Sequence, residues 1–66
     1  MLEKHSVTIA GHKTSFTLEP EFWAELKRLA STRGKSIAAI VASLDKEGGN
    51  LSSKIRVWVL KQLQST

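Results

Sequence analysis

The chain contains no cysteine, and this absence excludes disulfide bonds and metal sites built on thiolates. It also fits a reducing compartment. With 66 residues the chain has room for one domain, and a domain of this size buries only about 60% of its unfolded surface. Such a small core is marginal by itself. Because disulfides and thiolate metal sites are excluded, association with a second chain is the simplest way to stabilise it.

Long apolar runs and catalytic constellations are missing as well. No apolar run approaches the ~20 residues of a membrane span, and the start Met1-Leu2-Glu3-Lys4-His5 is too polar for a signal peptide. The chain has a single Asp and no evident pairing of a base with a nucleophile. The two histidines, His5 and His12, have no cysteine beside them to suggest a metal. We therefore expect a cytoplasmic protein that is no enzyme, binds no metal or cofactor and does not enter a membrane.

Positive charge is what the chain has in excess. Ten Lys and Arg residues stand against six Asp and Glu residues, which gives a net charge of +4. This balance favours a polyanionic partner, with nucleic acid as the first candidate. Because a soluble protein can be basic without any such partner, the charge does not decide the function by itself.

A strand is predicted over Lys13–Leu18. Phe16 and Leu18 alternate there with Ser15 and Thr17, which is typical of a strand with one buried face. The upstream segment Ser6-Val7-Thr8-Ile9 alternates in the opposite parity, so one continuous strand would put its apolar residues on the polar face. We therefore expect a turn or bulge at Ala10-Gly11-His12, where glycine permits unusual dihedral angles.

Three helices are predicted after this strand. The first runs from about Pro20 to Thr32, with proline at its first position and Arg33-Gly34 at its end. The second runs from about Ile37 to Lys46, with Ser36 as its cap, and the chain breaks at Gly48-Gly49-Asn50. The third covers about 51–64, with Asn50 or Ser52 as its cap. Residues 55–59 would also suit a strand, but the apolar spacing persists to Leu63 and favours a helix.

The apolar residues at strand and helix spacing predict the core and a dimer interface. They are Phe16, Leu18, Phe22, Trp23, Leu26, Leu29, Ile37, Ile40, Val41, Leu44, Ile55 and Trp58.

The single predicted strand needs a pairing partner, because it cannot satisfy its own backbone groups. Residues 6–9 could pair with it as a hairpin, although an isolated hairpin is marginal. The same strand of a second chain could instead pair with it across a two-fold axis and merge two small cores. We favour this second arrangement, an intertwined homodimer with an intermolecular antiparallel two-stranded sheet in a mostly α-helical fold. Whether residues 6–9 form an extra strand stays open.

The ordered combination of strand, helix, turn and helix resembles a known family. The stretch Lys-Thr-Ser-Phe-Thr-Leu-Glu-Pro-Glu-Phe-Trp at 13–23, followed by Arg33-Gly34-Lys35-Ser36, is similar to the ribbon-helix-helix superfamily of Arc and MetJ type. The resemblance covers about residues 12–47, within one domain over 1–66. Residues 6–12 and 50–53 also resemble a bacterial branch that has a third, C-terminal helix.

The resemblance implies a homodimer that places paired strands in the major groove of double-stranded DNA. It directs Lys13, Ser15 and Thr17 toward base edges. Lysine suits guanine acceptors, a hydroxyl can bond several base edges, and a threonine methyl can touch a thymine methyl. The resemblance also implies a phosphate contact at the turn before the second helix. The residues expected there are Arg33, Gly34, Lys35, Ser36 and Ile37.

Sequence-specific DNA binding by a transcriptional regulator is therefore the leading hypothesis, and more than one dimer per site stays open. A solvated strand face would carry the same residue types without reading DNA. One alternative is an antitoxin-like protein whose segment 51–66 docks on a protein partner. Another is a scaffold or dimerisation module that binds no DNA.

Overall fold

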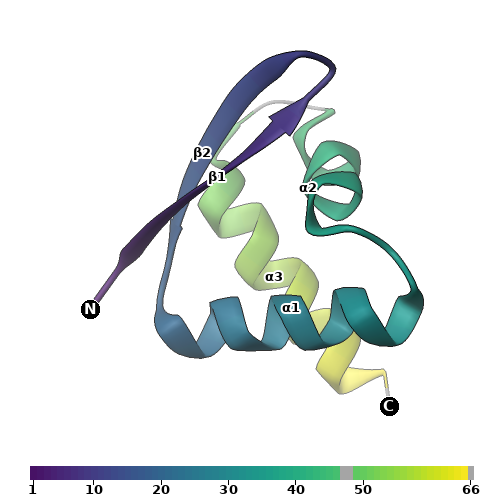
Figure 1. The fold of residues 1–66 in the computed structure, drawn as a ribbon. Helices are drawn as coiled ribbons and strands as arrows, with labels where there is room; N and C mark the ends of the chain where they lie inside the picture. Colours follow the sequence, from purple (N-terminus) through teal and green to yellow (C-terminus); the bar gives the residue numbers. More distant parts are fainter. Residues whose placement is uncertain (47–48, 66) are drawn as a thin grey trace.

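The computed structural model describes residues 1–46 and 49–65, and it contains two strands followed by three helices (Figure 1). These elements are β1 (Glu3–Ile9), β2 (His12–Leu18), α1 (Pro20–Arg33), α2 (Ile37–Asp45) and α3 (Leu51–Gln64). This order confirms the predicted fold of an N-terminal ribbon, two helices and a third C-terminal helix. Gly48, part of the predicted chain break, lies outside the described residues.

The two strands form an antiparallel hairpin with a very short turn. Ile9 lies opposite His12 and Glu3 opposite Leu18, and Ala10 and Gly11 make the connection. Their φ angles are 51° and 82°, and positive φ at both central residues is what a type I′ hairpin turn requires. This turn explains the change of parity, because antiparallel pairing places Val7 and Ile9 on the same face as the apolar residues of β2.

The structure adds an intramolecular hairpin to the expected ribbon. β2 pairs along its whole length with β1 of the same chain. The physical reason is the two-residue turn, which keeps both strands close together at a small cost in loop entropy. The isolated hairpin that seemed marginal is stabilised here because its apolar face packs on helices.

Each helix begins and ends at local signals in the sequence. α1 starts with proline and ends at Gly34, whose left-handed backbone lets the N–H groups of Gly34 and Lys35 donate to Ser31 and Ala30 carbonyls. The Ser36 hydroxyl caps α2 by accepting from the Ala39 N–H at 3.0 Å. Asn50, and not Ser52, caps α3 through its side chain. Residues 55–59 are helical.

The core lies between the inner face of the hairpin and the three helices. Seven of the twelve residues expected there are buried, and the other five, namely Phe22, Trp23, Ile37, Leu44 and Trp58, are half-buried against the core. That set omitted Ala30, Leu51 and Val59, which are buried too, and the β1 residues Val7 and Ile9, which are half-buried. Over the described part of the chain, no helix combines the length and apolar character needed to cross a membrane.

Candidate nucleic-acid interface

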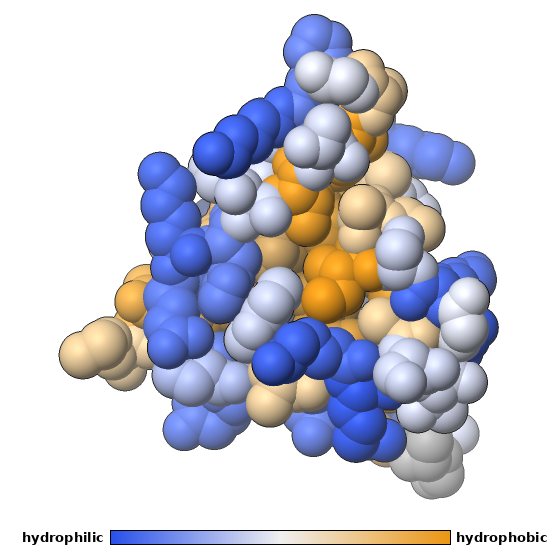
Figure 2. All heavy atoms as spheres, in the orientation of Figure 1, coloured by the Kyte–Doolittle hydropathy of each residue, from blue (hydrophilic) through white to orange (hydrophobic). Residues whose placement is uncertain are grey.

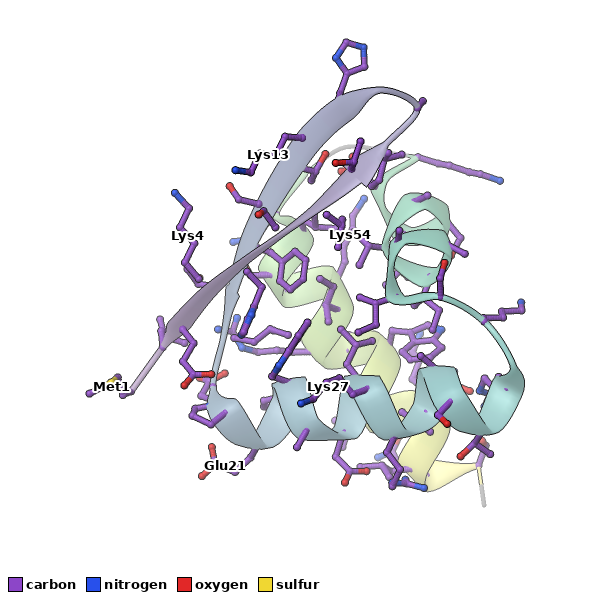
Figure 3. All side chains as sticks on the ribbon, in the orientation of Figure 1. Met1, Lys4, Lys13, Glu21, Lys27 and Lys54 are labelled. Carbon is purple, nitrogen blue, oxygen red and sulfur yellow. The ribbon has the colours of Figure 1, made fainter. Side chains whose placement is uncertain are left out.

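The hairpin presents a polar surface on the side that faces away from the helices. Six side chains make up this surface, which we call the outer face: Lys4, Ser6 and Thr8 from β1, and Lys13, Ser15 and Thr17 from β2. All are exposed except Thr17, which is half-buried. Figure 3 shows Lys4 and Lys13 directed away from the helices, and Figure 2 shows hydrophilic side chains along this flank of the molecule.

The buried inner face of the hairpin fixes which side chains point outward. Phe16 is 4% exposed and Leu18 is fully buried. Because successive residues of a strand alternate between its faces, a slip of one residue would expose these two and bury the polar set. The outer face is therefore held in place by the core. Neither strand, both of which are described completely, places an acidic side chain on it.

Lys13 and Ser15 lie exposed on the outer face, whereas Thr17 lies at its edge beside α3. The Thr17 N–H donates to the Ser52 hydroxyl at 3.0 Å, and the two hydroxyl oxygens are 3.5 Å apart. The beginning of α3 thus covers one end of the open edge of β2. Sequence reasoning could not find this contact, since 35 positions separate the two residues and no local pattern connects them.

Lys4, Ser6 and Thr8 share the outer face, although they were not predicted as site residues. The alternation of residues left open whether 6–9 form a strand, so their side chains had no assigned direction. The available signal was the alternation of Ser6 and Thr8 with Val7 and Ile9, once the turn at Ala10-Gly11 is taken to reverse the chain.

The residues expected at a phosphate lie together at the connection between α1 and α2, which we call the α1–α2 segment (residues 33–37). The Ser36 hydroxyl is used as the α2 cap, and Ile37 is half-buried against the core. Arg33 is drawn toward α3, because its guanidinium donates to the Gln62 side chain and lies 5.8 Å from the centre of the Trp58 ring. Arg33, Lys35 and Ser36 line a hollow there.

Within one chain, the outer face and the α1–α2 segment do not form a single site. β2 leads into the start of α1, and the segment follows the end of α1 (Figure 1). α1 has 14 residues, so its ends lie about 20 Å apart at 1.5 Å of rise per residue. The two groups therefore lie at opposite ends of α1.

The charged and aromatic groups next to the hairpin serve packing. The Arg56 guanidinium donates to the Glu19 carboxylate at 2.9 Å, and this hydrogen bond holds the pKa of Glu19 below its usual range. His5 stacks on Trp23, with ring centroids 3.7 Å apart, so it belongs to the inner face. Among the described residues, no three His, Cys, Asp or Glu side chains gather as metal ligands would.

Comparison with protein families gave one result. A family model described as a ribbon-helix-helix domain matches residues 2–63. Comparisons with curated proteins and with solved structures gave no significant match. The match extends through the hairpin and all three helices.

Proposed function

Because the chain belongs to the ribbon-helix-helix domain family, whose members generally bind DNA as transcription regulators, we propose that it binds double-stranded DNA sequence-specifically and regulates transcription. The observation that carries the proposal is the outer face of the hairpin, a two-stranded ribbon with lysine and hydroxyl side chains and no acidic residue. A ribbon of two strands fits the major groove, which is about 12 Å wide.

Base contacts are assigned to Lys13, Ser15 and Thr17. The Lys13 ammonium can donate to the O6 and N7 acceptors of guanine, and the Ser15 hydroxyl can donate or accept at several base edges. Thr17 can offer its methyl group to thymine while its hydroxyl stays near Ser52.

Phosphate contacts are assigned to the α1–α2 segment. The first N–H groups of α2, beginning with Ile37, have no acceptor within the helix, and a helix start attracts anions. Lys35 and Arg33 add positive charge beside Gly34 and Ser36. Arg33 would have to share its guanidinium between the phosphate and Gln62.

Ribbon-helix-helix domains typically bind DNA as dimers, and we propose a homodimer here. One chain leaves seven apolar residues only partly buried around its core, among them Val7, Ile9 and Ile37, and apolar surface is visible between the hairpin and the helices in Figure 2. Covering this surface with a second copy would strengthen a small core. A dimer predicts a melting temperature that rises with protein concentration. A melting temperature that does not change with concentration, together with sedimentation as a monomer, would exclude the dimer.

A second candidate function is the binding of a protein partner through α3. Val57, Leu60 and Leu63 are 47%, 51% and 41% exposed on this helix, and Val57 lines a hollow with Leu44 and Trp58 between α2 and α3. An antitoxin-like or scaffold protein would use such a surface. In that case Val57→Ser would weaken partner binding and leave DNA binding unchanged.

The test of DNA binding compares a site selected from random duplexes with random DNA at several salt concentrations. Ser15→Ala should narrow the affinity gap between the two DNAs by about 1–3 kcal/mol. Lys35→Ala should weaken both and reduce the salt slope by about one unit per lost phosphate contact. Lys27→Ala, a lysine on α1 outside both groups, is the matched control. Absence of salt-dependent binding by the parent protein would refute the proposal.

A further inference from the structure

The third helix supports the side chain of Arg33, the last residue of α1. α3 crosses α1, and its C-terminal half passes beside the end of α1 (Figure 1). The Gln62 side-chain oxygen accepts a hydrogen bond from the Nη2 group of Arg33. Trp58, one turn earlier on α3, places its ring centre 5.8 Å from the same guanidinium. Because Gln62 and Trp58 are both half-buried, they offer the exposed arginine a fixed support.

The partners of Arg33 differ in charge from those of the other two arginines. Arg28 donates to the Glu25 carboxylate at 2.8 Å, and Arg56 donates to the Glu19 carboxylate at 2.9 Å. Among the described residues, Arg33 has no ion-pair partner and contacts only a neutral amide and an indole ring. A carboxylate compensates the positive charge of a guanidinium, whereas these neutral groups do not. Arg33 is therefore held in place with its charge available to another anion.

The arrangement also leaves hydrogen-bond donors of Arg33 available. A guanidinium is a planar fork of N–H donors, and an aromatic ring covers its face while the donors in its plane stay open. Gln62 accepts from one of its nitrogens. The hollow that Arg33 lines together with Lys35 and Ser36 is also lined by Gln62 and Trp58, and none of the described residues that line it is acidic. A phosphate entering this hollow would meet cations and donors but no competing carboxylate.

We infer that Gln62 is a positioning residue for DNA binding, which holds the Arg33 guanidinium against Trp58 in the orientation that meets a backbone phosphate at the α1–α2 segment. The inference rests on the proposed function and gives α3 a part in DNA binding without any DNA contact of its own. A long side chain that is free in solution loses rotamer entropy when a ligand fixes it. Gln62 orders Arg33 before the DNA arrives, so this cost no longer weakens binding.

The closing experiment measures the affinity of Gln62→Met for a selected site and for random duplex DNA at several salt concentrations. Methionine keeps the length of the side chain but lacks the amide acceptor, so the melting temperature should stay close to that of the parent. We expect both affinities to fall by about 2- to 12-fold for each bound chain. The salt slope should not change, because the phosphate is still contacted. Gln64→Met, an exposed glutamine of the same helix, is the matched control.

Two further variants separate positioning from a purely structural role. Gln62→Glu retains an acceptor for Arg33 but compensates its charge. It should keep the thermal stability of the parent and bind DNA more weakly than Gln62→Met. Arg33→Ala should reduce the salt slope by about one unit per lost phosphate contact. The double variant of Arg33→Ala with Gln62→Met should bind no more weakly than Arg33→Ala alone, since Gln62 acts only through Arg33.

The possible results distinguish failure of the inference from failure of the proposed function. If Gln62→Met binds DNA as well as the parent or more tightly, Gln62 does not position Arg33; the inference is overturned and the proposed function stands. The same holds if the two substitutions add in full in the double variant. If Arg33→Ala keeps the affinity and salt slope of the parent, the phosphate contact of Arg33 is wrong and the inference falls with it. A parent protein that binds no DNA refutes the proposed function as well.

Discussion

The turn of the hairpin offers a direct test of the pairing within one chain. Ala10 has a φ of 51°, and it is the only residue other than glycine with a positive φ in the described part of the chain. A residue with a Cβ atom loses roughly 1–2 kcal/mol in this left-handed conformation. Asparagine adopts it more readily, and Asn-Gly is the preferred pair in a type I′ turn. Ala10→Asn should therefore stabilise the protein.

We expect the stabilisation to be about 1 kcal/mol, because asparagine relieves only part of the strain at an exposed position. For a domain of this size, 1 kcal/mol corresponds to a rise of about 4–8 °C in melting temperature. Gly11→Ala should have the opposite effect. Its φ is 82° and no atom lies within 4 Å of an added Cβ, so the loss of about 1 kcal/mol would be purely conformational.

The measurement is thermal unfolding followed by far-ultraviolet circular dichroism at several protein concentrations. Gly34→Ala is the matched control, since Gly34 also has a positive φ and open space around it but lies at the end of α1. It should destabilise the protein whichever strand pairs with β2. If Ala10→Asn and Gly11→Ala leave the melting temperature unchanged while Gly34→Ala lowers it, residues 10–11 do not form this turn. The pairing of β1 with β2 of the same chain is then wrong.

Three further predictions concern the packing that holds the outer face in place. Phe16→Ala should lower the free energy of unfolding by about 3–5 kcal/mol in chemical denaturation, because it empties a buried aromatic position; a parent-like midpoint would mean that the strand faces are assigned wrongly. Ser52→Ala should lower it by about 1 kcal/mol, since the edge of β2 loses its hydrogen bond, while Ser53→Ala, an exposed neighbour, should have a smaller effect. Glu19→Gln should destabilise the protein at neutral pH and not at low pH. The bond from Arg56 depresses the Glu19 pKa in the folded state, so its contribution is present above the unfolded pKa and disappears as the pH falls through the folded one; a destabilisation that persists in acid would contradict this assignment.

The helices and the face of β2 were predictable because their signals are local. Pro20, Gly34 and Ser36 mark helix ends through backbone geometry that involves only a few neighbouring residues. The alternation of Phe16 with Ser15 likewise fixes which side of the strand is buried. These signals placed Lys13 and Ser15 on an exposed polar face before any pairing was known.

The partner of β2 could not be predicted, because the alternation of residues is the same whether the second strand comes from this chain or another. The decision depends on the backbone at Ala10, and alanine gives little indication of a left-handed turn. Contacts between distant segments were equally hidden. Ser52 was considered only as a helix cap, yet its hydroxyl accepts a hydrogen bond from a backbone N–H of β2. The spacing of Arg33 and Gln62 does not predict their contact either.

The pairing of two strands within one chain also changes how the outer face of the hairpin can evolve. In a ribbon assembled from two identical chains, a single codon change alters both strands at once, and the preferred DNA element stays symmetric. Here β1 and β2 are encoded by different codons of one gene. A mutation at Ser6 changes one strand and leaves Ser15 on the other strand intact, so the two halves of the outer face can diverge one step at a time.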